Sequence, residues 1–295
     1  MNRRELLERS AALGGISAWI SSTGVALGSA TSAPLTPPAA GTIPVAFVLS
    51  KGAVVIDFAG PWEVFQDVNV AGRKEAPFDL YTVAETLEPV RASSGLMIVP
   101  NYSIDTSPAP KIIVIPAQRD AGKPLLDWIR NASKTTDITM SVCTGAFVLA
   151  ATGLLAGRSA TTHHDSYRVL AMDNPDISVK RGARFVEDGK IASSGGLSSG
   201  IDLALRVVER YFGREVATQT AFRMEYQGQG WLDADSNRIY AQQNVSPGQT
   251  VCTVCAMVVD PKSAPFTVYR GEQYYFCLPS HKARFDADPK KWLAA

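Results

Sequence analysis

The stretch Ile138-Thr139-Met140-Ser141-Val142-Cys143-Thr144-Gly145-Ala146-Phe147 decides the fold. Five residues of strand character end at Cys143, and a helical pattern over 144–155 begins at once. A strand that turns directly into a helix is typical of a parallel α/β sheet, and it lifts the corner residue above the carboxyl edge of that sheet. The pattern predicts a nucleophile elbow with Cys143 at its apex. A buried structural cysteine is the alternative.

The helix that follows Cys143 affects the expected chemistry of the thiol. A helix N-terminus stabilises a thiolate, so we expect the pKa of Cys143 to be lowered. Gly145 allows a neighbouring backbone to pass close to the turn.

Short apolar runs alternate with helical patterns on both sides of this stretch, which indicates an α/β fold with a parallel sheet. An Asp-Gly pair at 188–189 predicts a hairpin within 184–193. The remaining predicted strands are 44–49, 78–84, 111–115 and 138–142, and the predicted helices are 61–70, 123–132, 144–155, 198–211 and 215–226.

Length, charge and cysteine content exclude several classes of protein. The chain has 295 residues, with 29 Lys and Arg against 28 Asp and Glu, so it lacks the basic excess that a nucleic-acid partner requires. Four cysteines in a chain of this length do not make a disulfide scaffold. The composition divides the chain into a leader (1–33), a Pro-rich flexible tether (34–42), an α/β domain (43–232), a linker (233–249) and a small C-terminal domain (250–295).

The leader resembles a Tat-type export signal. Arg3 and Arg4 form a twin-arginine pair, a mildly apolar stretch rich in Gly, Ser and Ala spans 11–30, and small residues at Ala30 and Ala33 offer cleavage sites. The stretch is too weakly hydrophobic for a stable membrane span. We therefore expect a periplasmic or otherwise exported protein. An amphipathic N-terminal helix is the alternative.

A second candidate site follows the first predicted strand. Asp57 lies in an apolar run before Gly60 and Pro61, so its carboxyl either caps a helix or points into a site. Glu63 is expected on the first turn of that helix, where the helix dipole favours a carboxylate. This explanation is preferred over a role for Glu63 in the site.

Several motifs together resemble the ThiJ/PfpI superfamily, which has the class I glutamine amidotransferase-like fold. They are Asp57-x-x-Gly60-Pro61-x-Glu63, Ser141-Val142-Cys143-Thr144-Gly145-Ala146, Gly153-Leu154-Leu155-x-Gly157-Arg158, Asp188-Gly189-Lys190-Ile191 and Gly195-Gly196-x-x-x-Gly200-Ile201-Asp202. The resemblance implies a flavodoxin-like three-layer sandwich. It is strongest to the isonitrile hydratase branch and to the amidase-like sensor domains of AraC-type regulators.

The resemblance also implies roles for individual residues. Cys143 becomes the nucleophile, Asp57 its carboxyl partner and Thr144 an assisting hydroxyl. The reaction implied is hydration of a small electrophile of the isonitrile type to an N-substituted formamide, with no cofactor for the α/β domain and a homodimer as the assembly. The protease and glyoxalase-like branches carry His after the cysteine, so Thr144 disfavours them.

One segment departs from the superfamily pattern. Ala117 and Gln118 stand where the family usually has Gly-Gly, whose backbone donors lie near the nucleophile. We expect Ala117, Gln118 and Gly145 to surround the substrate as oxyanion-type donors, with side chains of the first two at the pocket rim. His163 is expected to be a structural or interface histidine, ahead of an acid or base role.

The C-terminal segment carries a cysteine–histidine cluster. Cys252 and Cys255 have C-x2-C spacing, and Cys277 and His281 have C-x3-H spacing some twenty residues later. Four such ligands suffice for a tetrahedral site that takes Zn or Cu(I). A Cys252–Cys255 disulfide with Cys277 buried is the alternative.

The stretch 270–277 together with 285–293 resembles a YHS domain, a small module of heavy-metal-handling proteins. Ala256 replaces the usual Gly, and His281 replaces a usual Cys. The main alternative to an exported hydratase is a non-catalytic envelope sensor or metal-handling protein. A transcription factor is not expected, because only about sixty residues follow the α/β domain and they lack a helix-turn-helix pattern.

Overall fold

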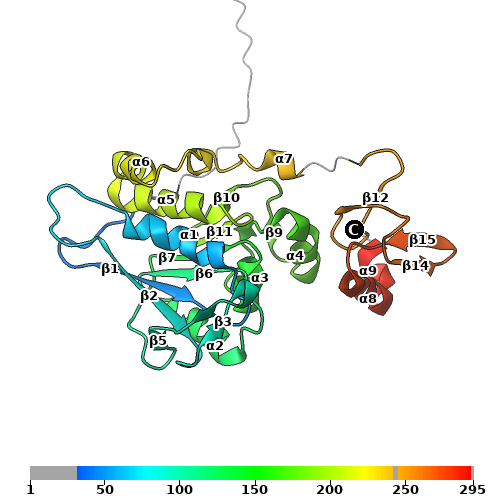
Figure 1. The fold of residues 1–295 in the computed structure, drawn as a ribbon, viewed down its shortest axis with the longest axis horizontal. Helices are drawn as coiled ribbons and strands as arrows, with labels where there is room; N and C mark the ends of the chain where they lie inside the picture. The colour runs from blue at the N-terminus through cyan, green and yellow to red at the C-terminus, as the bar shows by residue number, and fades with distance from the viewer. Residues whose placement is uncertain (1–31, 242–244, 294–295) are drawn as a thin grey trace, which may run out of the picture. The chain divides into compact units, whose positions relative to one another are not determined.

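The computed structural model describes residues 32–241 and 245–293, and its largest element is a seven-stranded sheet (Figure 1). The strand order is β10-β11-β7-β6-β1-β2-β5, and every neighbouring pair is parallel except β10 and β11. The strands are β1 (Ile43–Val48), β2 (Phe78–Ala84), β5 (Tyr102–Ser103), β6 (Ile112–Ile115), β7 (Ile138–Val142), β10 (Phe185–Asp188) and β11 (Ile191–Ser194). The predicted parallel α/β sheet is confirmed.

Helices cover both faces of the sheet, so the domain has three layers. The pairs on the two faces are α1 (Val55–Gln66) with α5 (Ser199–Phe212), and α2 (Lys123–Ala132) with α3 (Gly145–Ala151). α6 (Arg214–Arg223) packs on α5. The flavodoxin-like sandwich implied by the resemblance is therefore what the chain adopts.

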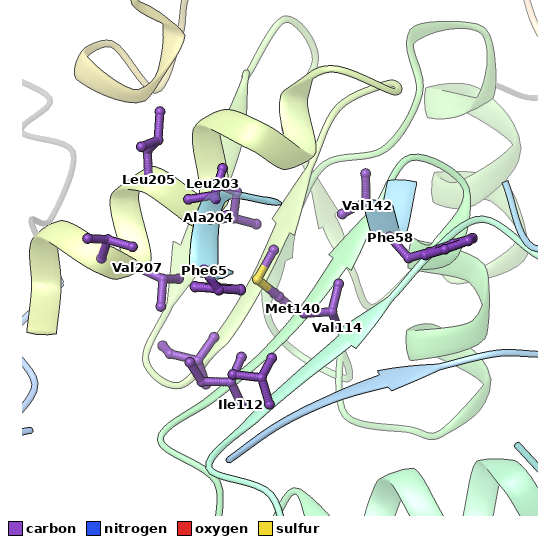
Figure 2. Close-up of a cluster of buried hydrophobic side chains, with 14 of the residues drawn as sticks. Phe58, Phe65, Ile112, Val114, Met140, Val142, Leu203, Ala204, Leu205 and Val207 are labelled. Carbon is purple, nitrogen blue, oxygen red and sulfur yellow. The ribbon is translucent and has the colours of Figure 1, made fainter. Parts of the chain in front are cut away.

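The core alternates between the two faces along each central strand. In β6, Ile112 and Val114 join the cluster under α1 and α5, whereas Ile113 and Ile115 join the cluster under α2 and α3. Figure 2 shows the first cluster, in which Val142 at the end of β7 lies close to Phe58 of α1. Each fully buried aliphatic side chain contributes about 1.5–3 kcal/mol. A strand buried on both faces therefore holds the elbow at its end rigidly.

Most predicted elements are confirmed, but two helices have other bounds than predicted and several elements were not predicted. α1 begins at Val55, six residues before the predicted start at Pro61, and α3 ends at Ala151 instead of continuing to 155. The helix α4 (Tyr167–Asp173) was not predicted. Nor were the two-residue strands β3 (Val90–Arg91), β4 (Met97–Ile98), β5, β8 (Ser159–Ala160) and β9 (Ser178–Val179).

The predicted hairpin is confirmed and positions the loop that faces Cys143. β10 and β11 are antiparallel, with Asp188 opposite Ile191. β11 also pairs in parallel with β7, with Ser194 beside Val142. As a result the Cys143 N–H donates to the Gly195 carbonyl at 2.9 Å, and residues 195–197 lie next to the elbow.

The predicted tether (34–42) and linker (233–249) make contacts with the α/β domain that the sequence did not indicate. In the tether, the Leu35 N–H donates to the Arg210 carbonyl, and Arg73 donates to the carbonyls of Pro38 and Gly41. The segment 233–249 contains α7 (Arg238–Ala241), and Asn237 is buried against Ser199. These contacts extend the α/β domain at both ends, so neither segment is a free connector in the described part. Residues 1–31 of the predicted leader (1–33) lie outside the described residues.

The C-terminal segment is built from two small hairpins and two short helices. Its elements are β12 (Thr250–Val251), β13 (Val258–Val259), β14 (Phe266–Tyr269), β15 (Glu272–Tyr275), α8 (Pro279–Ala287) and α9 (Pro289–Leu293). Phe276, Phe285 and Trp292 are buried there in a cluster that also contains Val169 of α4. In the part of the chain that the structure describes, no helix combines the length and apolarity needed to cross a bilayer.

Candidate active site and metal-ligand cluster

Cys143 lies at a strained corner between β7 and α3. Its φ of 58° is in the left-handed region, which costs energy for a residue with a side chain. The turn requires Gly145, because an added Cβ would meet the Ile115 carbonyl oxygen and lie 2.8 Å from that of Pro116. The elbow geometry is therefore what the sequence predicted, and Gly145 has a packing role in it.

Asp57 faces the elbow from the first turn of α1. Its side chain is fully buried, and its Oδ2 accepts the Ala117 N–H at 3.1 Å. Val54 precedes the helix as its N-terminal cap residue, so Asp57 is not the cap and its carboxyl belongs to the site. Its Oδ1 is buried and has no hydrogen-bond partner among the described residues.

Burial governs the acidity of Asp57. Desolvation raises its pKa to about 6, while the Ala117 N–H, His163 and a hydrogen bond with the Cys143 side chain act in the opposite direction. At neutral pH Asp57 is mostly ionised, yet it accepts a proton readily.

The pKa of Cys143 corrects the sequence-based expectation. Burial, followed by the negative charge of Asp57, raises this pKa to about 11, although a lowered value was predicted. The N–H groups of Leu197 and Thr144 lower it and are outweighed. α3 has only seven residues, so its dipole does not overcome burial beside a carboxylate. The Asp57–Cys143 pair therefore holds one proton at neutral pH, and the proton rests on sulfur.

The donors around the sulfur differ from the predicted ones. The Ala117 N–H is already bound by Asp57, so it is not free to stabilise an oxyanion. Gln118 accepts the Ser50 N–H through its Oε1 at 2.6 Å. Leu197 was not predicted as a donor; the Gly195-Gly196 run before it was the available signal.

His163 lies closer to the site than a purely structural histidine would. Its Nδ1 is hydrogen-bonded to Asp165, which together with the charge of Asp57 raises the pKa of His163 despite burial. A Cβ at Gly196 would clash with the His163 ring. The structure thus brings His163 and Asp165 beside Cys143 and Asp57, and no sequence motif had singled out Asp165.

Two other predicted residues have contrasting positions. Thr144 is half-buried, caps α3 without a side-chain hydrogen bond to it, and lines a cavity. Glu63 is exposed in the third turn of α1, where it accepts a hydrogen bond from Gln66. Glu63 was expected in the first turn, and it lies outside the site because α1 begins earlier than predicted.

A cavity of about 500 Å³ adjoins the elbow. Thr144, Ala117, Gln118, Ser93 and Ser94 are among the residues that line it. The other side chains that the sequence did not indicate are the cations Lys51, Arg91 and Arg119. A buried thiol, a carboxyl able to take its proton and an adjacent cavity suit nucleophilic addition to a small electrophile.

A separate cluster gathers four metal-ligand side chains in the C-terminal segment. The ligand atoms of Cys252, Cys255, Cys277 and His281 all lie within 4.8 Å of one another. The Cys277 sulfur lies 3.2 Å from His281 Nδ1 and 3.4 Å from the Cys255 sulfur. All four cysteines of the chain are free in the structure, so the Cys252–Cys255 disulfide is not formed. Ala256, which directly follows Cys255, has a φ of 65°. This left-handed conformation explains why a glycine suits the position.

The fold and the elbow together define an α/β protein of the flavodoxin-like class with a cysteine at its strand-to-helix corner. The family model described as the DJ-1/PfpI family matches residues 44–210, and the chain belongs to this family. The match spans the strands, the elbow and α5, which are the elements that build the site.

The relatives of this chain include proteins of different functional classes. The chain is 31% identical over 187 residues to an isonitrile hydratase of Pseudomonas putida, covering 62% of this chain and 78% of that protein. It is 30% identical over 188 residues to DJ-1alpha of Drosophila melanogaster, covering 60% and 81%. It is also 28% identical over 182 residues to the regulator CdhR of Pseudomonas aeruginosa, covering 59% of this chain and 52% of the regulator.

Solved structures agree with the fold. A ThiJ/PfpI family protein of Pseudomonas syringae superposes with a TM-score of 0.57 at 26% identity, covering 64% of this chain and 77% of that one. Because hydratases, DJ-1 proteins and regulators share this fold, the reaction depends on the site residues.

Proposed function

We propose that the chain is an exported hydratase that adds water to isonitriles, giving N-substituted formamides. The observation that carries the proposal is a pair of buried groups next to the cavity: the Cys143 thiol at its left-handed corner and the Asp57 carboxyl, whose Oδ1 has no hydrogen-bond partner among the described residues. The 31% identity to the Pseudomonas putida isonitrile hydratase supports the same reaction.

The first half of the reaction uses the Cys143–Asp57 pair. Asp57 takes the thiol proton as the sulfur attacks the terminal carbon of R–N≡C, and the carboxyl then delivers that proton to the same carbon. A C–S bond and a C–H bond form, and the product is an enzyme-bound thioimidate, R–N=CH–S. The unpartnered Oδ1 of Asp57 is free to carry the proton.

The second half releases the formamide. Asp57 takes a proton from water while the oxygen attacks the thioimidate carbon, and the carboxyl passes this proton to the nitrogen. The C–S bond then breaks as the C=O bond forms, the hydroxyl proton passes through Asp57 to the sulfur, and R–NH–CHO leaves. The N–H groups of Leu197 and Thr144 stabilise the departing thiolate. Over both halves, the net reaction is isonitrile plus water giving the formamide, and it needs no electron transfer.

The decisive experiment follows formamide production from cyclohexyl isocyanide by chromatography. We expect turnover by the purified chain and none by Cys143→Ala. Ser236→Ala is the control, because it truncates an exposed side chain that does not line the cavity, and it should retain turnover. Formation of product by Cys143→Ala would contradict the mechanism.

A binding role is the second candidate function. The raised pKa of Cys143 makes the thiol unreactive until Asp57 removes its proton, and the similarity to the regulator CdhR shows that this fold also occurs in regulators. No product from folded protein, together with slow labelling of Cys143 by a thiol reagent, would favour a ligand sensor in the cell envelope.

For the C-terminal segment we propose a structural or sensory metal site of the YHS type. Three sulfurs and one imidazole nitrogen, all mutually within 4.8 Å, fit a tetrahedral ion such as Zn(II) or Cu(I). We expect one metal ion per chain by elemental analysis, and loss of it in Cys255→Ser. Cys143→Ser should retain the metal, and equal metal content in both variants would contradict the assignment.

The location and the assembly remain proposals on separate grounds. The twin-arginine leader supports export, which replacement of Arg3 and Arg4 by Lys should block in cell fractionation. The family resemblance supports a homodimer, which sedimentation of the purified chain tests directly.

A further inference from the structure

We propose that the substrate carries an anionic group, which Arg91 and Arg119 bind at the mouth of the cavity while the reacting carbon lies at Cys143. This inference rests on the proposed hydratase reaction and specifies its substrate class. It predicts an isonitrile bearing a carboxylate or a phosphate.

The charge around the cavity is of one sign. Lys51, Arg91 and Arg119 line it, and no Asp or Glu is among its lining residues. These cations come from three places in the chain: the turn after β1, the strand β3 and the loop after β6. Chain segments far apart in sequence therefore place positive charge at one opening.

The two arginines are also free to bind a ligand. Lys51 already faces Asp120 at 3.8 Å. Over residues 32–241 and 245–293, by contrast, neither the Arg91 nor the Arg119 guanidinium forms an ion pair or hydrogen bond. The Arg119 side-chain carbons pack on Gly52, which holds the residue at the opening. Unpaired arginines in a concave site favour bidentate binding of a carboxylate or phosphate.

Gln118 provides an independent observation. Its Oε1 accepts the Ser50 N–H at 2.6 Å, which orients the amide and leaves Nε2 as a donor. That Nε2 is buried and has no acceptor among the described residues, yet the residue lines the cavity. A buried donor without an acceptor costs free energy, and a ligand oxygen would remove this cost.

Ser93 adds a further donor. Its Oγ accepts the Val55 N–H at 3.2 Å, so its own hydroxyl proton is available to the cavity. The polar lining thus supplies hydrogen-bond donors and positive charge, and an anionic acceptor is the group that satisfies both.

The position of these groups fits a substrate bound across the cavity. Thr144 and Ala117, which adjoin Cys143 and Asp57, line the same cavity as the arginines. A volume of about 500 Å³ accommodates a small molecule with one end at the thiol and the other at the opening.

Calorimetric binding of the reaction product tests the inference without turnover. The probes are N-formylglycine and the neutral N-formylglycinamide, titrated into the full chain and into Arg91→Met/Arg119→Met. We expect the acid to bind at least tenfold more tightly than the amide, and less than threefold more tightly in the double variant. The matched control is Arg223→Met, an exposed arginine of α6, which should retain the preference.

Three outcomes would overturn the inference: equal affinity for acid and amide, a preference that survives in the double variant, or no binding of either probe. A second arm uses N-formylaminomethylphosphonate, whose tighter binding would identify a phosphate as the anion and whose weaker binding would identify a carboxylate.

Turnover separates this inference from the proposed function. Isocyanoacetate should have a lower KM than its methyl ester, and the difference should shrink in the double variant. Binding of N-formylglycine without turnover of any isonitrile would contradict the hydratase and leave the anion site intact. Turnover with no preference between acid and ester would contradict the anion site alone.

Discussion

At the scale of single residues, the chemistry depends on where one proton resides. Burial raises the pKa of both Asp57 and Cys143, and the carboxylate beside the sulfur keeps the thiol protonated. The sequence indicated both residues and their partnership. It did not indicate the sign of the cysteine shift, because that sign depends on burial and on the distance to a charge.

The first prediction concerns the pH dependence of turnover. Asp57 must be ionised to take the thiol proton, so kcat/KM should rise as pH increases through about 6 and then level off. In Asp57→Asn the rise should disappear, and the rate at pH 8 should fall by at least about 100-fold. A rate that declines from pH 5 to pH 8 would show that the protonated carboxyl is the active form.

The second prediction concerns stability. The folded-state pKa of Asp57 is raised from 3.8 to about 6, so the folded state binds more protons than the unfolded state between these values. Unfolding free energy therefore falls as pH rises from about 4 to about 6, and the loss persists above that range. At pH 8 Asp57→Asn should be more stable than the wild type by up to about 3 kcal/mol.

Urea denaturation of both proteins at pH 8 and pH 4 checks this second prediction. The two proteins should differ by less than about 1 kcal/mol at pH 4, where Asp57 is protonated in the folded state and close to half protonated in the unfolded state. Asp79→Asn, a change to an exposed carboxyl on β2, is the control and should show no comparable gain. Destabilisation of Asp57→Asn at pH 8 would contradict the sign of the shift.

At the scale of elements, the packing of α1 against α5 accounts for a proline inside α1. Pro61 suggested a helix start, since proline favours the first helical position. In the structure it lies inside α1, 3.3 Å from where a Cβ on Gly200 would be, and a Cβ on Gly60 would lie 2.9 Å from Ile201. α1 and α5 are thus packed closely, and this packing compensates for the hydrogen bond that Pro61 cannot make.

The third prediction tests the close packing at the elbow. Gly145→Ala would push a methyl group into the carbonyls of Ile115 and Pro116, backbone atoms that cannot move without disturbing β6. We expect a loss of about 3 kcal/mol in unfolding free energy, measured by urea denaturation. Gly153→Ala is the matched control. A Cβ at Gly153 would meet no neighbouring atom, and the only strain would come from its left-handed φ of 81°. This substitution should therefore cost about 1 kcal/mol in unfolding free energy.

At the scale of the whole molecule, the Cys143 site and the cysteine–histidine cluster are built from separate parts of the chain. The Cys143 site uses residues of the sheet and its loops, whereas the four candidate metal ligands lie within residues 252–281. The C-terminal segment buries only a small core around Phe276, Phe285 and Trp292. A core of this size leaves a segment dependent on additional cross-links such as a metal ion.

The fourth prediction follows from this dependence. Removal of metal by a chelator should unfold the C-terminal segment, seen as faster amide hydrogen exchange over residues 250–293 and unchanged exchange in β6 and β7. Readdition of Zn(II) should restore protection. Equal exchange in the segment before and after chelation would show that its core alone is sufficient.

The amino-acid sequence by itself indicated the main strands and helices of the α/β domain, the elbow at Cys143 and the Cys–His set near the end of the chain, and the family resemblance implied the partnership with Asp57. Local periodicity and short motifs carry this information, because each depends on neighbouring residues. Only the tertiary structure decided the raised pKa of Cys143, the use of the Ala117 N–H by Asp57, and the presence of Arg91 and Arg119 in the lining of one cavity. These features depend on burial and on contacts between residues distant in sequence, which no local pattern records.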